Sequence, residues 1–226
     1  MEISEIIDRK LLDEQIKKSQ RARSGKWNPS SFGRCYRYQF WNRKNKPHSN
    51  PVGVNTLRIF KVGELFHNFV QQFFTPEQRE IQTETEDILG FADIVLETEV
   101  IDIKSIRSFA FKLFKKKDYD ITVDKYDNIL QLMVYVWLLK KEAGRLVYID
   151  KDTLEIKEFI FNLPNWIDKV KEELEILQGY WKQDKLPPPL ARVYNGKECN
   201  YCVFQDTCYG LQGKNNTITE KGGELK

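Results

Sequence analysis

The sequence has no long apolar run. None of its hydrophobic stretches approaches the roughly 18 residues that a membrane-spanning helix needs. The N-terminal segment MEISEIIDRKLLDEQIKKSQ is charged throughout and has no apolar core of the kind that a signal peptide requires. We therefore expect an intracellular, cytoplasmic protein without a membrane partner. A flavin or nicotinamide motif is also missing, which disfavours a redox enzyme.

Cysteine and histidine are scarce, with 4 Cys and 2 His in 226 residues. In an intracellular protein we do not expect these cysteines to form disulfides. Disorder is excluded over most of the length, because 14 Phe, 10 Tyr and 5 Trp supply ample buriable surface. The length and the 41% hydrophobic content predict one domain with a small appendage.

The positive charge is unevenly distributed. Residues 1–61 contain 14 Lys and Arg against 5 Asp and Glu, whereas the remainder is acidic on balance. A second basic block, Lys104–Lys117, interleaves its charges with Phe109, Phe111 and Phe114. This combination suits a nucleic-acid backbone with unstacked bases. A solvated face whose Phe side chains enter the core explains the block equally well.

Hydrophobic periodicity predicts an alternation of helices and strands. Apolar residues at helical spacing indicate helices at residues 2–20, 57–74, 125–142 and 164–181. Short segments with strand character lie at 81–89, 91–97, 100–105, 145–150 and 154–161. The helix at 125–142 is apolar nearly all round and is expected to end at Gly144. This order predicts a single α/β or α+β domain with a small C-terminal module.

The segment GFADIVLETEVIDIKS, residues 90–105, contains the main candidates for chemistry. If Thr98 and Glu99 form a two-residue turn between antiparallel strands, Asp93 pairs with Lys104 and shares a face with Asp102. The two carboxylates are then diagonal neighbours within roughly 7–8 Å. Isoleucines on the same strands would anchor the opposite face in the core: Ile94, Ile101 and Ile103.

Two carboxylates that converge repel each other unless a cation lies between them. Oxygen ligands favour Mg²⁺ or Mn²⁺, and Lys104 could stabilise negative charge on phosphorus or position an attacking water. The alternative is an ordinary cross-strand ion pair between Asp93 and Lys104, with Asp102 solvated.

Three other polar side chains lie on predicted helices. His67 follows Gly63 by one turn, and the missing side chain of Gly63 would let another backbone approach closely. A single helix histidine can also be an ordinary polar residue. Gln131 and Tyr135 are the polar exceptions in an apolar helix, so they bond either the sheet backbone or the lysine and a substrate phosphate.

In order along the chain, these motifs resemble those of the RecB-like nucleases of the PD-(D/E)XK superfamily. They are Gly63-x-x-x-His67, Gly90-x-x-Asp93, Asp102-x-Lys104 and Gln131-x-x-x-Tyr135. The match spans residues 30–210 and implies a restriction-endonuclease-like core, a central mixed sheet flanked by helices. It also implies a metal-dependent DNA exonuclease. Catalysis would be assigned to Asp93, Asp102, Lys104, Gln131 and Tyr135, and metal binding to His67, Asp93, Asp102 and the carbonyl of Ile103.

The cysteines look like those of the iron–sulfur branch, which includes the CRISPR-associated Cas-four nucleases and AddB-type nuclease domains. Cys35 is followed far downstream by a C-x₂-C-x₅-C pattern at Cys199, Cys202 and Cys208. Such spacing favours a bound metal over unliganded thiols. Zinc sites usually present two close pairs, whereas a [4Fe–4S] cluster tolerates one distant ligand, so zinc is the alternative. The cluster would be structural, packing the C-terminal module on the N-terminal segment.

The expected organisation has four segments. These are an N-terminal helix and basic linker (1–29), the nuclease core (30–190), the cysteine module (191–210) and a disordered tail (211–226). Side chains expected to track DNA phosphates are Arg34, Arg37, Arg43, Lys44, Lys112, Lys115, Lys116 and Lys117.

The expected substrate is the single-stranded end of DNA. The resemblance implies partners among CRISPR integration or recombination proteins. The alternative is a catalytically silent iron–sulfur subunit that binds DNA ends within a larger complex.

Overall fold

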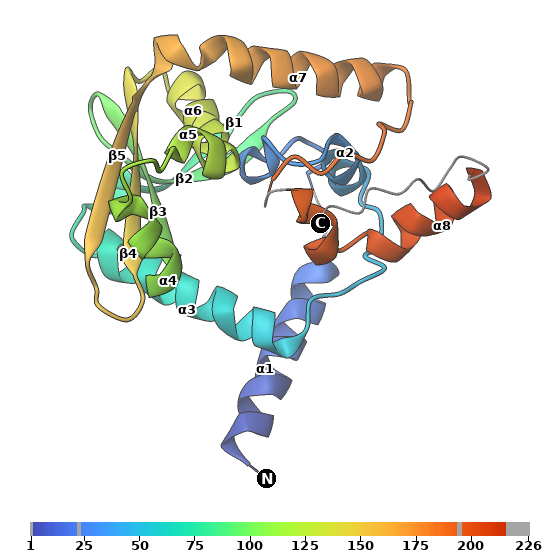
Figure 1. Ribbon diagram of the computed structural model, residues 1–226, viewed down its shortest axis with the longest axis horizontal. Coiled ribbons are helices and arrows are strands. Elements are labelled where there is room, and N and C mark those ends of the chain that lie inside the picture. Colours follow the sequence, from blue (N-terminus) through green and yellow to red (C-terminus); the bar gives the residue numbers. More distant parts are fainter. Residues whose placement is uncertain (1, 22–23, 194–195, 216–226) are drawn as a thin grey trace, which may run out of the picture.

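The computed structural model describes residues 2–21, 24–193 and 196–215, with side chains described as far as residue 211. A five-stranded mixed sheet forms its centre, with the strand order β1-β2-β3-β4-β5 (Figure 1). The strands are β1 (Arg79–Glu84), β2 (Leu89–Val95), β3 (Glu99–Ile106), β4 (Ala143–Asp150) and β5 (Ile156–Asn162). All neighbours are antiparallel except β3 and β4, which run parallel. The predicted α/β core with a central mixed sheet is confirmed.

The helices are α1 (Ile3–Ser19), α2 (Tyr36–Arg43), α3 (Val54–Gln71), α4 (Ser108–Phe111), α5 (Ile121–Asp124), α6 (Tyr126–Leu138), α7 (Ile167–Lys182) and α8 (Gln205–Asn215). Helices α3, α4 and α6 pack on this sheet, whereas α1 and α8 lie away from it (Figure 1). The four predicted helices correspond to α1, α3, α6 and α7. Helix α6 provides the crossover between the parallel strands β3 and β4, as parallel pairing requires.

Helix α6 ends earlier than predicted, and Gly144 does not terminate it. Lys140 adopts a left-handed conformation with φ 55°, and β4 already begins at Ala143. Gly144 therefore lies in the strand, where a Cβ would come within 2.6 Å of Leu132 Cγ and 2.7 Å of Met133 Cε. Gly144 is needed because α6 packs closely on the sheet at this position. The sequence pattern does not distinguish a glycine with this role from a glycine that ends a helix.

The two faces of the sheet carry separate apolar clusters. On one face, α3 packs Phe66 and Val70 against a group of buried aliphatic residues, Ile94, Ile101, Ile103, Val147 and Ile149. This confirms that the three isoleucines anchor one face. On the other face, α6 lies between the sheet and α7 and is buried on most sides (Figure 1).

The β2–β3 turn lies one position before the predicted one. Ile94 pairs with Ile101, and the Leu96 N–H donates to the Glu99 carbonyl at 2.9 Å, so residues 97–98 form the turn. The predicted pairing of Asp93 with Lys104 is therefore wrong.

Among the described residues, the pairing of β2 with β3 comprises Ile94 with Ile101 and Val95 with Val100. Asp93 lies just beyond these pairs, and its side chain accepts a hydrogen bond from the Ile103 N–H at 2.7 Å. Asp102 and Lys104, two residues apart on β3, share a face as predicted.

The C-terminal module packs on the N-terminal segment. Phe204 is fully buried, and its ring lies 5.8 Å from that of Tyr38 and 5.3 Å from that of Trp41. Helix α8 continues to Asn215, into the predicted tail, and residues 216–226 lie outside the described part of the chain. No helix among the described residues is long and apolar enough to cross a membrane.

Candidate active site

The Asp93 carboxylate is held from two elements. Its Oδ2 accepts a hydrogen bond from the Ile103 N–H at 2.7 Å and lies 3.5 Å from His67 Nδ1 on α3. Burial alone would raise the pKa of Asp93, but the hydrogen bond with His67 and the charge of Lys104 lower this pKa overall. The pKa of His67 is raised, because pairing with Asp93 outweighs the opposing effect of burial. The structure thus brings His67 and Asp93 together.

Asp102 is buried, with 2% of its surface exposed. Its Oδ1 accepts a hydrogen bond from Gln131 Nε2 at 2.9 Å. Its Oδ2 lies 2.7 Å from Lys104 Nζ and forms an ion pair with it. Burial raises the pKa of Asp102 to about 6 in spite of the lysine. The alternative interpretation was an ion pair between Asp93 and Lys104 with a solvated Asp102. It is wrong in both respects, because Lys104 pairs with Asp102 and the Asp102 carboxylate is buried.

The Lys104 ammonium is held between polar groups. Besides Asp102, its Nζ lies 3.4 Å from Gln131 Oε1. Burial would lower the pKa of Lys104, but the charges of Asp102 and Asp93 raise this pKa. The lysine consequently remains a cation at neutral pH and is aimed by Asp102 and Gln131 together.

Gln131 and Tyr135 serve different partners. Gln131 bonds the lysine–carboxylate pair, whereas Tyr135 packs against the backbone of β2, where a Cβ on Gly90 would meet its hydroxyl at 2.7 Å. Burial raises the pKa of Tyr135.

Gly90 is required because α6 approaches β2 closely through the Tyr135 hydroxyl. A Cβ on Gly63, in contrast, would meet only Ser105 Oγ, at 3.8 Å. The close backbone approach expected at Gly63 does not occur.

Sequence reasoning missed Gln71, which supports the site from α3. Gln71 is buried, and its Nε2 donates to the Asp93 carbonyl at 3.2 Å and to Glu80 Oε1 at 2.6 Å. Its position one turn after His67, on the same helix face, was the signal that could have found it.

The donor set suits a hard divalent cation. Asp102 supplies a buried carboxylate, and Asp93 and His67 add a second carboxylate and an imidazole. Within the described ranges, however, no three His, Cys, Asp or Glu side chains stand in an arrangement that would hold a metal ion. In this arrangement Lys104 pairs with Asp102, and His67 lies beside Asp93.

The four cysteines line one small cavity with a volume of about 90 Å³. They are half-buried free thiols and come from three places: the start of α2 (Cys35), the turn at 198–202 (Cys199 and Cys202) and α8 (Cys208). Burial raises the pKa of Cys199 and of Cys202, so thiolates here need a neighbouring cation. Four sulfurs around one cavity suit an iron–sulfur cluster or zinc in donor chemistry.

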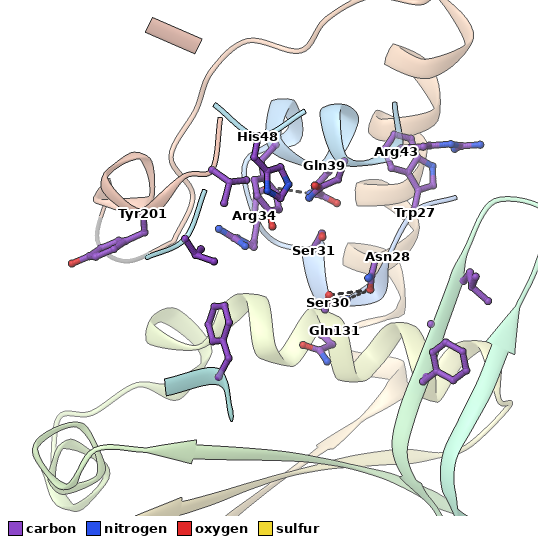
Figure 2. A pocket seen from close by; sticks show the side chains of 18 of the residues that line it. Trp27, Asn28, Ser30, Ser31, Arg34, Gln39, Arg43, His48, Gln131 and Tyr201 are labelled. Atoms are coloured by element: carbon purple, nitrogen blue, oxygen red, sulfur yellow. Dashed lines mark hydrogen bonds between the residues drawn. The ribbon is translucent and has the colours of Figure 1, made fainter. Parts of the chain in front are cut away.

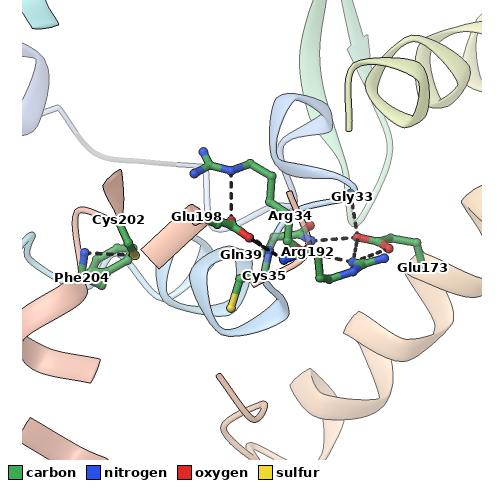
Figure 3. A network of polar contacts seen from close by, with 9 residues as sticks. All are labelled: Gly33, Arg34, Cys35, Gln39, Glu173, Arg192, Glu198, Cys202 and Phe204. Carbon is green, nitrogen blue, oxygen red and sulfur yellow. Dashed lines mark hydrogen bonds and ion pairs between the residues drawn. The ribbon is translucent and has the colours of Figure 1, made fainter. Parts of the chain in front are cut away.

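A buried glutamate beside this cavity was not predicted. Glu198 is 2% exposed and accepts hydrogen bonds from the Cys35 N–H at 3.1 Å, from the Arg192 N–H at 3.0 Å and from Arg34 Nε at 3.3 Å (Figure 3). It therefore joins the N-terminal segment to the cysteine module. The sequence around it, GKECN, carries no signal of burial.

A second buried glutamate, Glu173 on α7, continues the network. It accepts hydrogen bonds from the Gly33 N–H at 2.9 Å and Gln39 Nε2 at 2.8 Å, and it pairs with Arg192 at 2.7 Å (Figure 3). Its place between Val170 and Leu177 on the apolar stripe of α7 was a signal that it would be buried. Together the two glutamates position the loop that carries Cys35.

Several side chains predicted to bind DNA have partners within the protein. Arg37 donates to Cys208 Sγ at 3.3 Å and to the Pro187 carbonyl at 2.7 Å. Arg43 pairs with Asp87 at 3.0 Å, and its guanidinium lies between the rings of Trp27 and Trp181. Other ion pairs join Arg34 to Glu198, Lys44 to Asp184 and Lys115 to Glu155.

The basic block at 104–117 has features of both interpretations, with some Phe side chains in the core and other side chains exposed. Phe111 is buried and Phe114 packs against Tyr148, whereas Phe109 is 80% exposed. Lys112, Lys116 and Lys117 are exposed.

No family model and no curated protein sequence matches the chain. Among solved structures, SSO0001 is similar, with 24% identity and a TM-score of 0.57 over 92% of this chain and 96% of that one. The alkaline exonuclease LHK-Exo from Laribacter hongkongensis is also similar, with 13% identity and a TM-score of 0.50 over 74% of this chain and 93% of that one. The chain therefore shares the fold of a known exonuclease, as its resemblance to the PD-(D/E)XK nucleases implied.

Proposed function

We propose that this protein is a metal-dependent DNA exonuclease that acts on single-stranded ends. The observation that supports it best is the buried Asp102 carboxylate, which is held by Lys104 and Gln131, with Asp93 on the neighbouring strand. A buried carboxylate whose pKa is raised by burial is costly to keep without a function. The fold that LHK-Exo shares is consistent with this activity.

The residues have distinct proposed roles. Asp93, Asp102, His67 and the carbonyl of Ile103 would hold Mg²⁺ or Mn²⁺, which when bound polarises phosphate and lowers the pKa of water. Lys104 remains protonated beside Asp102 and stabilises the negative charge that develops on phosphorus. Gln131 fixes the orientation of this ammonium, and Tyr135 packs α6 against β2 at Gly90.

The cysteines have a structural role in the proposal. Cys35, Cys199, Cys202 and Cys208 would hold a [4Fe–4S] cluster, with zinc as the alternative. A brown protein with a broad visible absorption band, lost when a cysteine is replaced by serine, distinguishes the cluster from zinc. A setting with CRISPR integration or recombination proteins belongs to the same proposal.

A second candidate function is the binding of DNA ends without cleavage. It is favoured because Lys104 pairs with Asp102 and His67 lies beside Asp93 in the described structure. Binding that survives chelation, without cleavage in any divalent metal, would support this candidate.

The test is digestion of end-labelled single-stranded DNA with Mg²⁺, with Mn²⁺ and with chelator. We expect cleavage only with metal, and we expect Asp102→Asn to lower the rate by on the order of 10³-fold, because one metal ligand is lost. Asp168→Asn, at an exposed position on α7, is the matched control and should cleave like the wild type. Unchanged cleavage by Asp102→Asn would remove the assigned site.

A further inference from the structure

A groove with a volume of about 1510 Å³ lies where the N-terminal segment, α6 and the cysteine module meet (Figure 2). Gln131 and Tyr135 of α6 line it, together with Gly90 of β2. Because Gln131 also donates to Asp102, the groove comes within one hydrogen bond of the candidate active site. Lys197 and Tyr201 bring the cysteine module into its wall, and Figure 2 shows Tyr201 at the edge of the groove.

The charge of the lining has one sign. Among the described residues no Asp or Glu lines the groove, although the sequence contains 33 of them. Five basic residues do line it: Lys26, Arg34, Arg43, Arg107 and Lys197. A lining of this kind attracts a polyanion.

Two of the five cations are available to a ligand. Lys26, Arg34 and Arg43 already pair with carboxylates that lie behind the lining. Arg107 and Lys197 are exposed, and no carboxylate of the described chain forms an ion pair with either. They stand on different elements, at the start of α4 and in the cysteine module, so a bound chain could contact both.

Exposed aromatic rings accompany these charges. Tyr201 is 72% exposed, Phe60 is 55% exposed and Phe91 is 49% exposed, and all three line the groove. Positive charge together with aromatic platforms is the combination that binds single-stranded nucleic acid, because unpaired bases offer their faces for stacking. The bases of a duplex are already stacked and cannot use such rings.

We propose that this groove holds the single DNA strand on its way to the active site, an inference that rests on the proposed nuclease function. Arg107 and Lys197 contact phosphates, and Tyr201 stacks on an unpaired base. Part of the DNA site is therefore supplied by the cysteine module, and the lysines at 112–117 contribute less than the groove.

The experiment measures binding separately from cleavage. The anisotropy of a fluorescein-labelled oligothymidylate is titrated with the full-length protein in chelator, so that no metal-dependent cleavage occurs. We expect the double variant Arg107→Ala/Lys197→Ala to bind at least about 10-fold more weakly, with a salt slope reduced by about 1.4 for two lost single-strand phosphate contacts. The matched control Lys171→Ala/Lys185→Ala removes the same charge from exposed positions outside the groove and should stay within about 2-fold of the wild type.

The stacking of the Tyr201 ring on a base is tested by a separate pair of variants. Tyr201→Ala should weaken binding by between about 5-fold and about 100-fold, whereas Tyr201→Phe, which keeps the ring, should bind like the wild type. Circular dichroism and iron content, unchanged in these variants, show that the cysteine module remains folded.

Three results would overturn the groove. They are wild-type binding by Arg107→Ala/Lys197→Ala, a larger loss in Lys116→Ala/Lys117→Ala, and equal affinity for blunt duplex with no effect of Tyr201→Ala. The two proposals fail separately. If binding follows the groove variants but no metal supports cleavage, the nuclease assignment fails and the groove stands. If metal-dependent cleavage is seen but binding ignores the groove variants, the groove alone fails.

Discussion

The candidate active site and the cysteine module gather metal-binding side chains in different ways. Asp93 and Asp102 lie on neighbouring strands, whose backs are fully buried through Ile94 and Ile103. The cysteines come from segments that are distant in sequence, and their half-buried cavity is bordered by Glu198 and a few aromatic rings. The sheet therefore positions its carboxylates whether or not a metal is bound. The module is held by the polar contacts of Glu198 and by the packing of Phe204 against Tyr38 and Trp41.

The largest expected effect tests this difference directly. Cys202→Ser should eliminate the cluster and cost about 3 kcal/mol or more of unfolding free energy, because a cross-link between distant segments is lost. Hydrogen exchange measured by mass spectrometry should show faster exchange in residues 196–215, with the amides of β2 and β3 still protected. Equal loss of protection in the sheet and the module would show that the two regions are not independent.

Glu198→Ala should destabilise the module next most strongly. The substitution leaves the N–H groups of Cys35 and Arg192 and the charge of Arg34 without their buried acceptor, at a cost of about 2–3 kcal/mol in urea unfolding. Glu198→Gln keeps one acceptor oxygen and should lose less. The control is Glu158→Ala, which removes an exposed ion pair with Arg145 and should change stability by no more than about 0.5 kcal/mol.

Metal binding at the sheet site should depend on pH through Asp102. The pKa of Asp102 is raised to about 6, so its carboxyl is ionised above that pH and becomes protonated below it. Protons then compete with metal, and the dissociation constant for Mn²⁺ should rise by up to about 10-fold per pH unit between about pH 6 and about pH 5. His67, whose pKa is raised by Asp93, acts in the same direction.

The pH experiment is isothermal titration of the protein with Mn²⁺ between about pH 8 and about pH 5. Asp102→Asn should bind weakly at every pH and lose most of the dependence. A dissociation constant that is flat across this range in the wild type would contradict the assignment of Asp102 as a ligand.

The smallest expected effect concerns Arg37. Its guanidinium donates to Cys208 Sγ, so Arg37→Ala should remove a positive charge beside the cluster and make the reduction potential more negative by a few tens of millivolts. Lys44→Ala, an exposed cation paired with Asp184, is the control and should leave the potential unchanged. If Arg37→Ala weakens DNA binding and leaves the potential unaltered, the phosphate-tracking role first expected for Arg37 would be restored.

Much of the fold could be predicted from the sequence, because the signals for helices and strands are local. The helical spacing of Val62, Phe66 and Val70 predicted α3, and strand alternation placed Asp102 and Lys104 on one face. Gly144 was misjudged, because a glycine that permits close packing and one that ends a helix have the same letter. The β2–β3 turn was misplaced by one position because Glu97, Thr98 and Glu99 are all acceptable turn residues.

The partners of charged side chains were the least predictable part. Lys104 could reach either carboxylate on its face, and its pairing with Asp102 depends on Gln131 from α6, a helix distant in the chain. Arg37 and Arg43 looked like DNA-binding residues until the fold placed Cys208 and Asp87 beside them.

The sequence alone determined the helices and strands, their apolar faces, and which acidic, basic and thiol groups are available. Hydrophobic periodicity and motif spacing are local signals, so they can be recognised within one or two turns of the chain. Only the tertiary structure decided that Glu198 and Glu173 are buried, that the cysteines share one cavity, and that a groove lined by no described carboxylate leads toward Asp102. The physical reason is that burial and charge pairing depend on which distant segments pack together, and no local pattern of residues records that choice.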